Sequence, residues 1–410
     1  MGRDKLGSRL GFILLSAGCA IGIGNVWKFP YVVGQNGGGL FVLIYLFFLV
    51  ILGIPVLTME FSIGRAAQKS PAKMYEQLEP KGSKWHLHGK VSLIGCYLLM
   101  MFYTTVAGWM LKFFVSTASG EIVGMDTAAV ENHFNVDVLG DPVSLIVYMG
   151  IVVAIGVAVC LIGVQNGLEK VAKIMMLALL AIMVVLAVNS FTLPGGAEGL
   201  SFYLMPDLSV IEKVGITNIL VSAMNQAFFT LSIGMGSMAI FGSYIGKDRS
   251  LLGESVNVAL LDTFVAVASG LIIFPACSAY GVDVTSGPKL LFITLPNIFN
   301  NIPLGRLWGS LFFVFMSFAA LSTVLAVFEC IIANTMDLWG LSRKKACIIN
   351  GILLFLLSVP CCLGFNVHSA TMCGPDSSRS AQEARYLTLK ILQSATSFFR
   401  SARLYSFCSV

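Results

Sequence analysis

The segment 18–30 interrupts a hydrophobic run that is long enough to cross a lipid bilayer. It reads Gly-Cys-Ala-Ile-Gly-Ile-Gly-Asn-Val-Trp-Lys-Phe-Pro, so several glycines, a lysine and a proline stand inside an apolar stretch. Glycine weakens a helix by about 1 kcal/mol relative to alanine, and proline removes a backbone donor. Free backbone groups are tolerated at membrane depth only inside protein or along a polar cavity. The segment is therefore a candidate binding site.

The composition indicates a polytopic membrane protein. Hydrophobic residues make up 57% of the 410 residues and charged residues only 11%, whereas about a quarter of a soluble domain is charged. A membrane-spanning helix needs about 20 apolar residues. Nine segments qualify: about 10–33, 39–64, 91–116, 144–163, 169–190, 217–243, 257–282, 307–336 and 346–364. No cleavable signal peptide is evident, because the first apolar run lacks a small-residue cleavage site.

The charges between these segments predict the orientation. Segments 1–9, 65–90, 164–173, 244–250 and 337–345 together hold sixteen Lys and Arg, whereas the loops on the other side hold three before residue 365. By the positive-inside rule the N-terminus is cytoplasmic. The net charge of +5 is then a signal of topology, and no nucleic-acid partner is expected. The ten cysteines lie mostly within spans and form no CxxC pair, so neither a disulfide framework nor a zinc site is expected.

A weak internal repeat relates the first and sixth spans. Gly22-Ile23-Gly24 in the first is echoed by Gly234-Met235-Gly236 in the sixth. Interrupted helices at corresponding positions of two halves indicate the central site of a transporter. The offset of five spans is odd, so the two halves would insert with opposite orientations.

Several spaced motifs extend this pattern over residues 1 to 365. They are Arg9-Leu10-Gly11-Phe12, the Gly22-to-Pro30 motif, Asn36-Gly37-Gly38-Gly39, Gly53-Ile54-Pro55 with Glu60, Tyr103 with Gly108-Trp109, and the Thr230-to-Gly236 break. Together they resemble the neurotransmitter:sodium symporter family, and most of all its bacterial amino-acid transporters. The resemblance implies a five-plus-five inverted repeat, in which residues 1–190 form the first repeat and residues 217–364 an incomplete second repeat. Spans 1 and 6 would unwind around one amino acid and two sodium ions.

The resemblance also implies two sets of sodium ligands. The first set combines the substrate carboxylate with Ala20, Asn25, Thr230 and Asp262. The second set is Gly18, Ile21 and Ala319 through carbonyls, with Ser322 and Thr323 through hydroxyls. Sodium is a hard cation that prefers such oxygen ligands. The alternative for the Ser and Thr residues is a hydrogen bond to their own helix.

Two acids within apolar spans, where an ionised side chain is costly, stand out: Asp262 and Glu60. Asp262 stands where many chloride-dependent members of the family carry Asn, so its charge would replace chloride; the alternative is a protonated carboxyl that only packs. Glu60 would accept hydrogen bonds from loose amides of the unwound spans; the alternative is a proton carrier.

For the substrate, the resemblance implies a binding site at the breaks. Gly22 and Gly24 would let the backbone approach the ligand, and Tyr103 would bind its carboxylate. The amine would meet carbonyls near Ala20, Phe229, Thr230 and Ser232. The side-chain pocket would consist of Leu99, Phe229, Met235, Thr323 and Val327. Because this pocket holds no acid or base, a hydrophobic or aromatic L-amino acid is expected.

Charged residues are expected to gate the two mouths. Arg3 and Asp337 match the inner pair of the family, and Lys28 takes the outer position where Arg is common. Leu6 departs from the pattern, because a Trp usually packs there.

Residues 367–410 are the largest departure. They are polar and contain no 18-residue apolar run. We back-translated residues 386–402 with chosen codons and read them in a shifted frame. The result resembles the start of the family's tenth span, which favours a frameshift over an interfacial tail.

The sequence thus predicts a sodium-coupled amino-acid importer of a bacterial cytoplasmic membrane. It does not predict an enzyme, since all four His lie outside the spans. The alternatives are an inactive truncated fragment and, less in keeping with the sequence, an ion channel.

Overall fold

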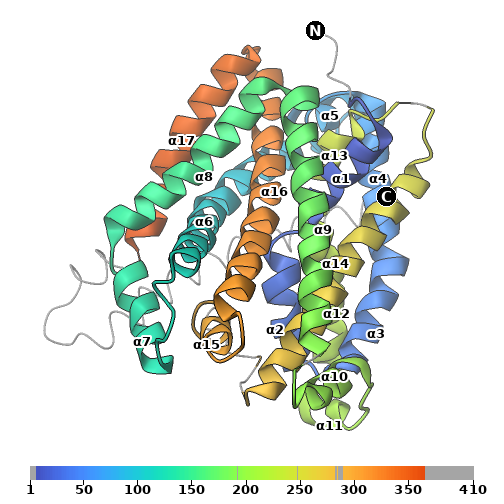
Figure 1. Cartoon of the computed structure of the whole chain (residues 1–410). Coiled ribbons are helices and arrows are strands. Elements are labelled where there is room, and N and C mark those ends of the chain that lie inside the picture. Colours follow the sequence, from blue (N-terminus) through green and yellow to red (C-terminus); the bar gives the residue numbers. More distant parts are fainter. Residues whose placement is uncertain (1–5, 192, 247, 282–283, 285–289, 365–410) are drawn as a thin grey trace, which may run out of the picture.

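The described part of the chain is a bundle of helices that run between two opposite ends of the molecule (Figure 1). The computed structural model describes residues 6–191, 193–246, 248–281, 284 and 290–364. Among these residues, seven helices are long and apolar enough to cross a membrane. They are Gly39–Ala67 (α3 and α4, joined by a π-helical turn), α6 (His86–Ser119), α8 (Pro142–Ile162), Val164–Phe191 (a π-helical turn and α9), α14 (Leu251–Ala279), α16 (Gly305–Trp339) and α17 (Arg343–Leu363).

The first and sixth predicted spans are broken. Helix α1 (Arg9–Ala20) and the following Gly24–Gln35, which contains α2 (Phe29–Gln35), pass the length test together but meet at 54°. Helices α12 (Ile216–Thr230) and α13 (Ser237–Gly242) flank the irregular segment 231–236. There Ser232, Gly234 and Gly236 all have positive φ, at 51°, 91° and 79°. The other seven predicted spans correspond to the seven continuous helices.

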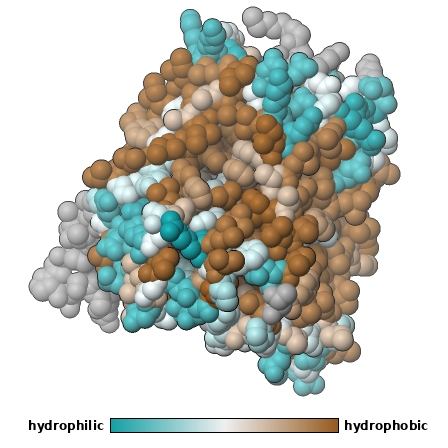
Figure 2. Space-filling model, in the orientation of Figure 1, coloured by the Kyte–Doolittle hydropathy of each residue, from teal (hydrophilic) through white to brown (hydrophobic). Residues whose placement is uncertain are grey.

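Short helices cover the two ends of the bundle. Helix α5 (Pro71–Leu78) lies at one end, near α13 and the start of α1, which we call the α5 end (Figure 1). The opposite end, which we call the α11 end, carries α7 (Thr127–Asn132), α10 (Gly196–Leu204), α11 (Val210–Val214) and α15 (Leu295–Asn300). Figure 2 shows polar residues gathered towards the ends and a broad apolar belt between them. The belt includes large side chains such as Ile174, which is 70% exposed, and lipid would cover them. The chain is a multi-pass membrane protein.

Local signals set where the helices begin. Ser8 caps α1 by accepting a hydrogen bond from the Gly11 amide, and Ser250 caps α14 through the Gly253 amide. Asp141 caps α8 through two amides. Each cap satisfies amides that have no partner within the helix.

Helix α16 forms the centre of the bundle (Figure 1). It packs against α6, α9, α1 and α8, and most of its side chains are buried. Small and polar residues on α16, among them Ala319, Ser322 and Thr323, therefore face other helices instead of lipid.

Candidate functional site

The two breaks meet in the interior of the bundle. The hydroxyl of Ser232, in the second break, donates a hydrogen bond of 3.0 Å to the carbonyl of Cys19, near the end of α1. Helices α14 and α16 pack against α1 from other sides. Backbone that cannot form a regular helix is thus enclosed by protein, as membrane depth requires.

A first oxygen cluster joins three elements. The Asn25 side-chain amide donates to Oδ1 of Asp262 at 2.7 Å and to Oγ1 of Thr230 at 3.0 Å. The Thr230 hydroxyl donates to Oδ2 of Asp262 at 2.7 Å. All three side chains are at most 1% exposed. Ala20, the fourth residue of this predicted set, is buried and is the last residue of α1. The structure therefore brings together a carboxylate, an amide and a hydroxyl beside the first break.

A second oxygen cluster joins the end of α1 to α16. The Ser322 hydroxyl lies 3.2 Å from the Ile21 carbonyl and 3.0 Å from the Ala319 carbonyl. The Thr323 hydroxyl lies 3.4 to 3.5 Å from the carbonyls of Gly18, Ile21 and Ala319. All five residues of the second predicted set lie together. The cluster offers neutral oxygens only, which suit a hard monovalent cation.

Tyr103 of α6 lies between the first break and α16. Its hydroxyl accepts a hydrogen bond of 2.9 Å from the Ile23 amide. A Cβ atom added to Gly22 would lie 2.4 Å from this hydroxyl and 2.6 Å from Oγ1 of Thr323, and one added to Gly24 would lie 2.5 Å from the Phe229 ring. Only glycine fits at such distances, so the two glycines let the backbone approach the groups that would surround a ligand.

The predicted side-chain pocket draws on four elements, one of which is α12, which carries Phe229. Leu99 lies on α6, Met235 in the second break, and Thr323 and Val327 on α16, which packs along α6. Val327, Thr323 and Met235 are buried, and Leu99 is partly buried against the apolar core. The ammonium of Lys28 lies 3.3 Å from the centre of the Phe229 ring, so the predicted outer-gate residue covers one wall of this pocket.

Three side chains hold the second break in place. Glu60 accepts a hydrogen bond of 2.5 Å from the Gly234 amide. Ser92 and Cys96 of α6 both donate to the Met235 carbonyl. Sequence reasoning predicted the role of Glu60 as an acceptor, but it missed Ser92 and Cys96. These two gave no signal, because Ser and Cys are common in apolar spans.

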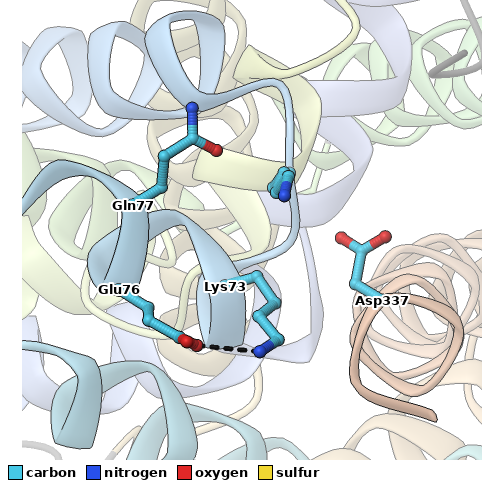
Figure 3. A pocket seen from close by; sticks show the side chains of 5 residues that line it. Lys73, Glu76, Gln77 and Asp337 are labelled. Carbon is cyan, nitrogen blue, oxygen red and sulfur yellow. Dashed lines mark hydrogen bonds and ion pairs between the residues drawn. The ribbon is translucent and has the colours of Figure 1, made fainter. Parts of the chain in front are cut away.

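A cavity of about 310 Å³ opens at the α5 end beside Asp337 (Figure 3). Its lining residues are Lys69, Lys73, Glu76, Gln77 and Asp337. Lys73 and Glu76 form an ion pair of 2.9 Å, and this hydrogen bond holds the pKa of Glu76 below its ordinary value. Oδ2 of Asp337 accepts a hydrogen bond of 2.6 Å from the Ser70 amide.

Arg3, the predicted partner of Asp337, lies outside the described residues, as does the predicted tail 367–410. Leu6 is partly buried against the core.

A buried charge on α16 was missed in the sequence analysis. Glu329 is fully buried, binds the guanidinium of Arg343 and accepts a hydrogen bond of 2.6 Å from Tyr244. An acid within the span 307–336 was a visible signal, of the same kind as Asp262. The pair joins α16 to α17 and to the loop after α13, so its position indicates a structural role near the α5 end.

Known proteins with similar sequences include sodium-dependent transporters. A sequence model of the sodium:neurotransmitter symporter family matches residues 3–137 and 127–369. The uncharacterized sodium-dependent transporter YhdH of Bacillus subtilis is 37% identical over 88% of this chain and 79% of its own length. The sodium- and chloride-dependent taurine transporter of the dog is 26% identical over 89% of this chain and 66% of its own length.

A solved structure gives the same result for the fold. The crystal structure of MhsT in complex with L-phenylalanine superposes with a TM-score of 0.82 at 36% identity, covering 97% of this chain and 89% of MhsT. The overall fold of this chain is thus shared with a protein that was solved in complex with an amino acid. This chain belongs to the sodium:neurotransmitter symporter family, whose members couple transport to sodium.

Proposed function

We propose that this chain is a symporter that carries an apolar or aromatic L-amino acid together with two sodium ions. The observation that carries the proposal is the placement of the two oxygen clusters. They lie at the first break, and Gly22 and Tyr103 stand between them. One ligand position at Gly22 would thus contact both clusters.

The two clusters would be filled in different ways. The first would take sodium between Asp262, Asn25, Thr230 and the Ala20 carbonyl, and the substrate carboxylate would complete it. The second would take sodium between the carbonyls of Gly18, Ile21 and Ala319 and the hydroxyls of Ser322 and Thr323. Each ion would join α1 to helices that lie elsewhere in the bundle, so binding favours the closed arrangement of the breaks.

The substrate class follows from the pocket and from one relative. The predicted pocket residues Leu99, Phe229, Met235, Thr323 and Val327 offer apolar surface and one hydroxyl, and no acid is among them. MhsT was solved with L-phenylalanine. The amine would bind near the carbonyls of Ala20, Phe229, Thr230 and Ser232, and Tyr103 would donate to the carboxylate. The chain would not require chloride, because Asp262 already supplies a negative charge.

Transport would follow by alternating access across a bacterial cytoplasmic membrane, with the N-terminus and the α5 end in the cytoplasm. The α5 end carries the Lys-rich and Arg-rich segments, which supports this orientation. Residues 1–190 and 217–364 would be the two repeats. The half-helix α1 ends at the first break and α13 begins after the second, so both would move without unfolding the continuous helices.

The test is sodium-dependent binding and transport of tritiated L-phenylalanine by the purified chain. Binding is measured first by scintillation proximity, because it needs only an assembled site, and uptake into proteoliposomes second. Both should require sodium and should fail when choline replaces it. Equal binding in choline would contradict the proposal.

Two controls separate the competing functions. Unlabelled L-leucine should compete with the label, whereas taurine, the named substrate of the canine relative, should not. Counterflow of label against an internal pool of unlabelled amino acid distinguishes a carrier from a channel, because a channel gives no counterflow. An enzyme would return a chemically changed product, which chromatography of the recovered label detects.

A further inference from the structure

The first turn of α5 lies against the last residue of the second break, Gly236. A Cβ atom added to Gly236 would lie 2.6 Å from Cγ of Pro71 and 3.1 Å from Oγ of Ser92. Gly236 has a φ of 79° and stands immediately before α13. The start of α13 therefore rests on the ring of Pro71, with no side chain between them.

The same turn is held by two side chains of α16. Oδ2 of Asp337 accepts from the Ser70 amide at 2.6 Å, and Oδ1 of Asn334 accepts from the Ala72 amide at 2.9 Å. Ser70 and Ala72 are fully buried. Helix α5 is thus capped by another helix, since Ser70 makes no capping hydrogen bond with its own side chain. The first turn of α5 is therefore fixed by α16, while the helix also packs against α6 and α4.

A second chain of contacts leads from this turn to the break. The Asn334 amide donates to the Cys330 carbonyl at 2.8 Å, and the Cys330 and Cys96 sulfurs lie 3.9 Å apart. Cys96 in turn lies 3.6 Å from the Met235 carbonyl. The contact through Pro71 and the contact through the two cysteines therefore end at neighbouring residues of the break, Met235 and Gly236.

We propose that the turn Ser70-Pro71-Ala72, clamped by Asp337 and Asn334, is a positioning element that couples the cytoplasmic mouth to the substrate site. The proposal rests on the proposed function, because it assigns the turn a role in alternating access. When the turn is clamped, Pro71 supports Gly236 and the break keeps the shape that binds substrate. When the clamp at Asp337 opens, α13 loses this support and can move away from α5.

The native cysteines report directly on this motion. Cys96 and Cys330 are fully buried beside the break, and Cys160 on α8 is fully buried elsewhere. Alkylation by N-ethylmaleimide, followed at each cysteine by peptide mass spectrometry, measures how often each site opens. The measurement needs neither sodium nor substrate.

The variant Pro71→Ala should raise the alkylation rate of Cys96 and Cys330 about tenfold, since it removes two buried ring carbons from the contact. The rate at Cys160 should stay unchanged. Pro80→Ala is the matched control, because Pro80 lies in the same loop but is exposed, and it should alter none of the rates. Asn334→Ala, which leaves the loop sequence intact, should give the same pattern as Pro71→Ala.

Two results would overturn the coupling role. One is an unchanged rate at Cys96 and Cys330. The other is an equal increase at Cys160, which would show general loosening of the fold.

Added sodium and L-phenylalanine should restore the protection of Cys96 in Pro71→Ala, at a higher amino-acid concentration than the wild type needs for binding. Failure of the wild type to bind would count against the proposed function alone, because the alkylation rates without ligand still decide the coupling.

Discussion

The two oxygen clusters differ in what supplies their oxygens. The first depends on three side chains, Asn25, Thr230 and Asp262, which hydrogen-bond to one another. The second depends on three backbone carbonyls that meet the hydroxyls of Ser322 and Thr323. The first therefore includes an acidic side chain and is sensitive to residue identity, whereas the second offers only neutral groups and is sensitive to the shape of the break. Substitutions in the two clusters should accordingly differ in size.

The largest effect is expected from Asp262→Ala. This change leaves the Asn25 amide and the Thr230 hydroxyl without their buried acceptor. Removing one partner from a buried charged network costs about 3 to 5 kcal/mol, so apparent sodium affinity should fall about 100-fold or more. Sodium titration of L-phenylalanine binding measures the change.

Asp262→Asn is the control for shape. The variant should bind sodium and L-phenylalanine well only when chloride is present, and gluconate should not replace chloride. A wild type that already needs chloride would contradict the role given to Asp262.

Asn25→Ala should have the next largest effect. It removes the donor that joins Asp262 to Thr230 and one proposed sodium ligand. Loss of a hydrogen bond to a charged group costs about 1.5 to 3 kcal/mol, so sodium affinity should fall about 10-fold to 100-fold. The same sodium titration applies, with Asn36→Ala as the matched control because the Asn36 side-chain amide donates to the Val32 carbonyl of its own turn. Equal losses in the two variants would show that the effect is not specific to the cluster.

Gly22→Ala tests the space between the clusters. The added methyl would lie within 2.6 Å of both Tyr103 and Thr323, and overpacking costs about 1 to 3 kcal/mol. Amino-acid affinity should fall about tenfold or more, with a smaller change in sodium affinity. Gly253→Ala should leave both affinities unchanged, since the added atom would lie 3.6 Å from Ser250, an ordinary van der Waals contact. A Gly22→Ala protein that binds normally would rule out a ligand position against this glycine.

Thr323→Val should give the smallest effect. It keeps the shape of the side chain and removes one neutral hydroxyl from the second cluster. A hydrogen bond of this kind is worth about 1 kcal/mol, so sodium affinity should fall about fivefold. Thr323→Ser keeps the hydroxyl and should restore the affinity. If Thr323→Val matched the loss caused by Asp262→Ala, the distinction between the two clusters would be wrong.

The contrast between the clusters also explains what could be predicted from the sequence. A carboxylate within an apolar span is costly enough to stand out in a sequence, and Asp262 was singled out for that reason. Glu329 gave the same signal and was missed, because no motif placed it beside the breaks. The carbonyls of Gly18, Ile21 and Ala319 carry no signal of their own, since every residue has one, and only the family resemblance selected them.

The spans and their breaks were determined by the sequence itself. Hydrophobic runs of about 20 residues specify membrane helices whatever their neighbours are, and glycines at 22, 24, 234 and 236 mark where two of them cannot continue. The clamp on α5 was decided only by the tertiary structure. Asp337 and Asn334 reach backbone amides more than 260 residues away along the chain, and an amide has no residue identity that a sequence pattern could reveal. Such contacts arise when packing brings a helix start against a side chain, so they become visible only once the bundle is assembled.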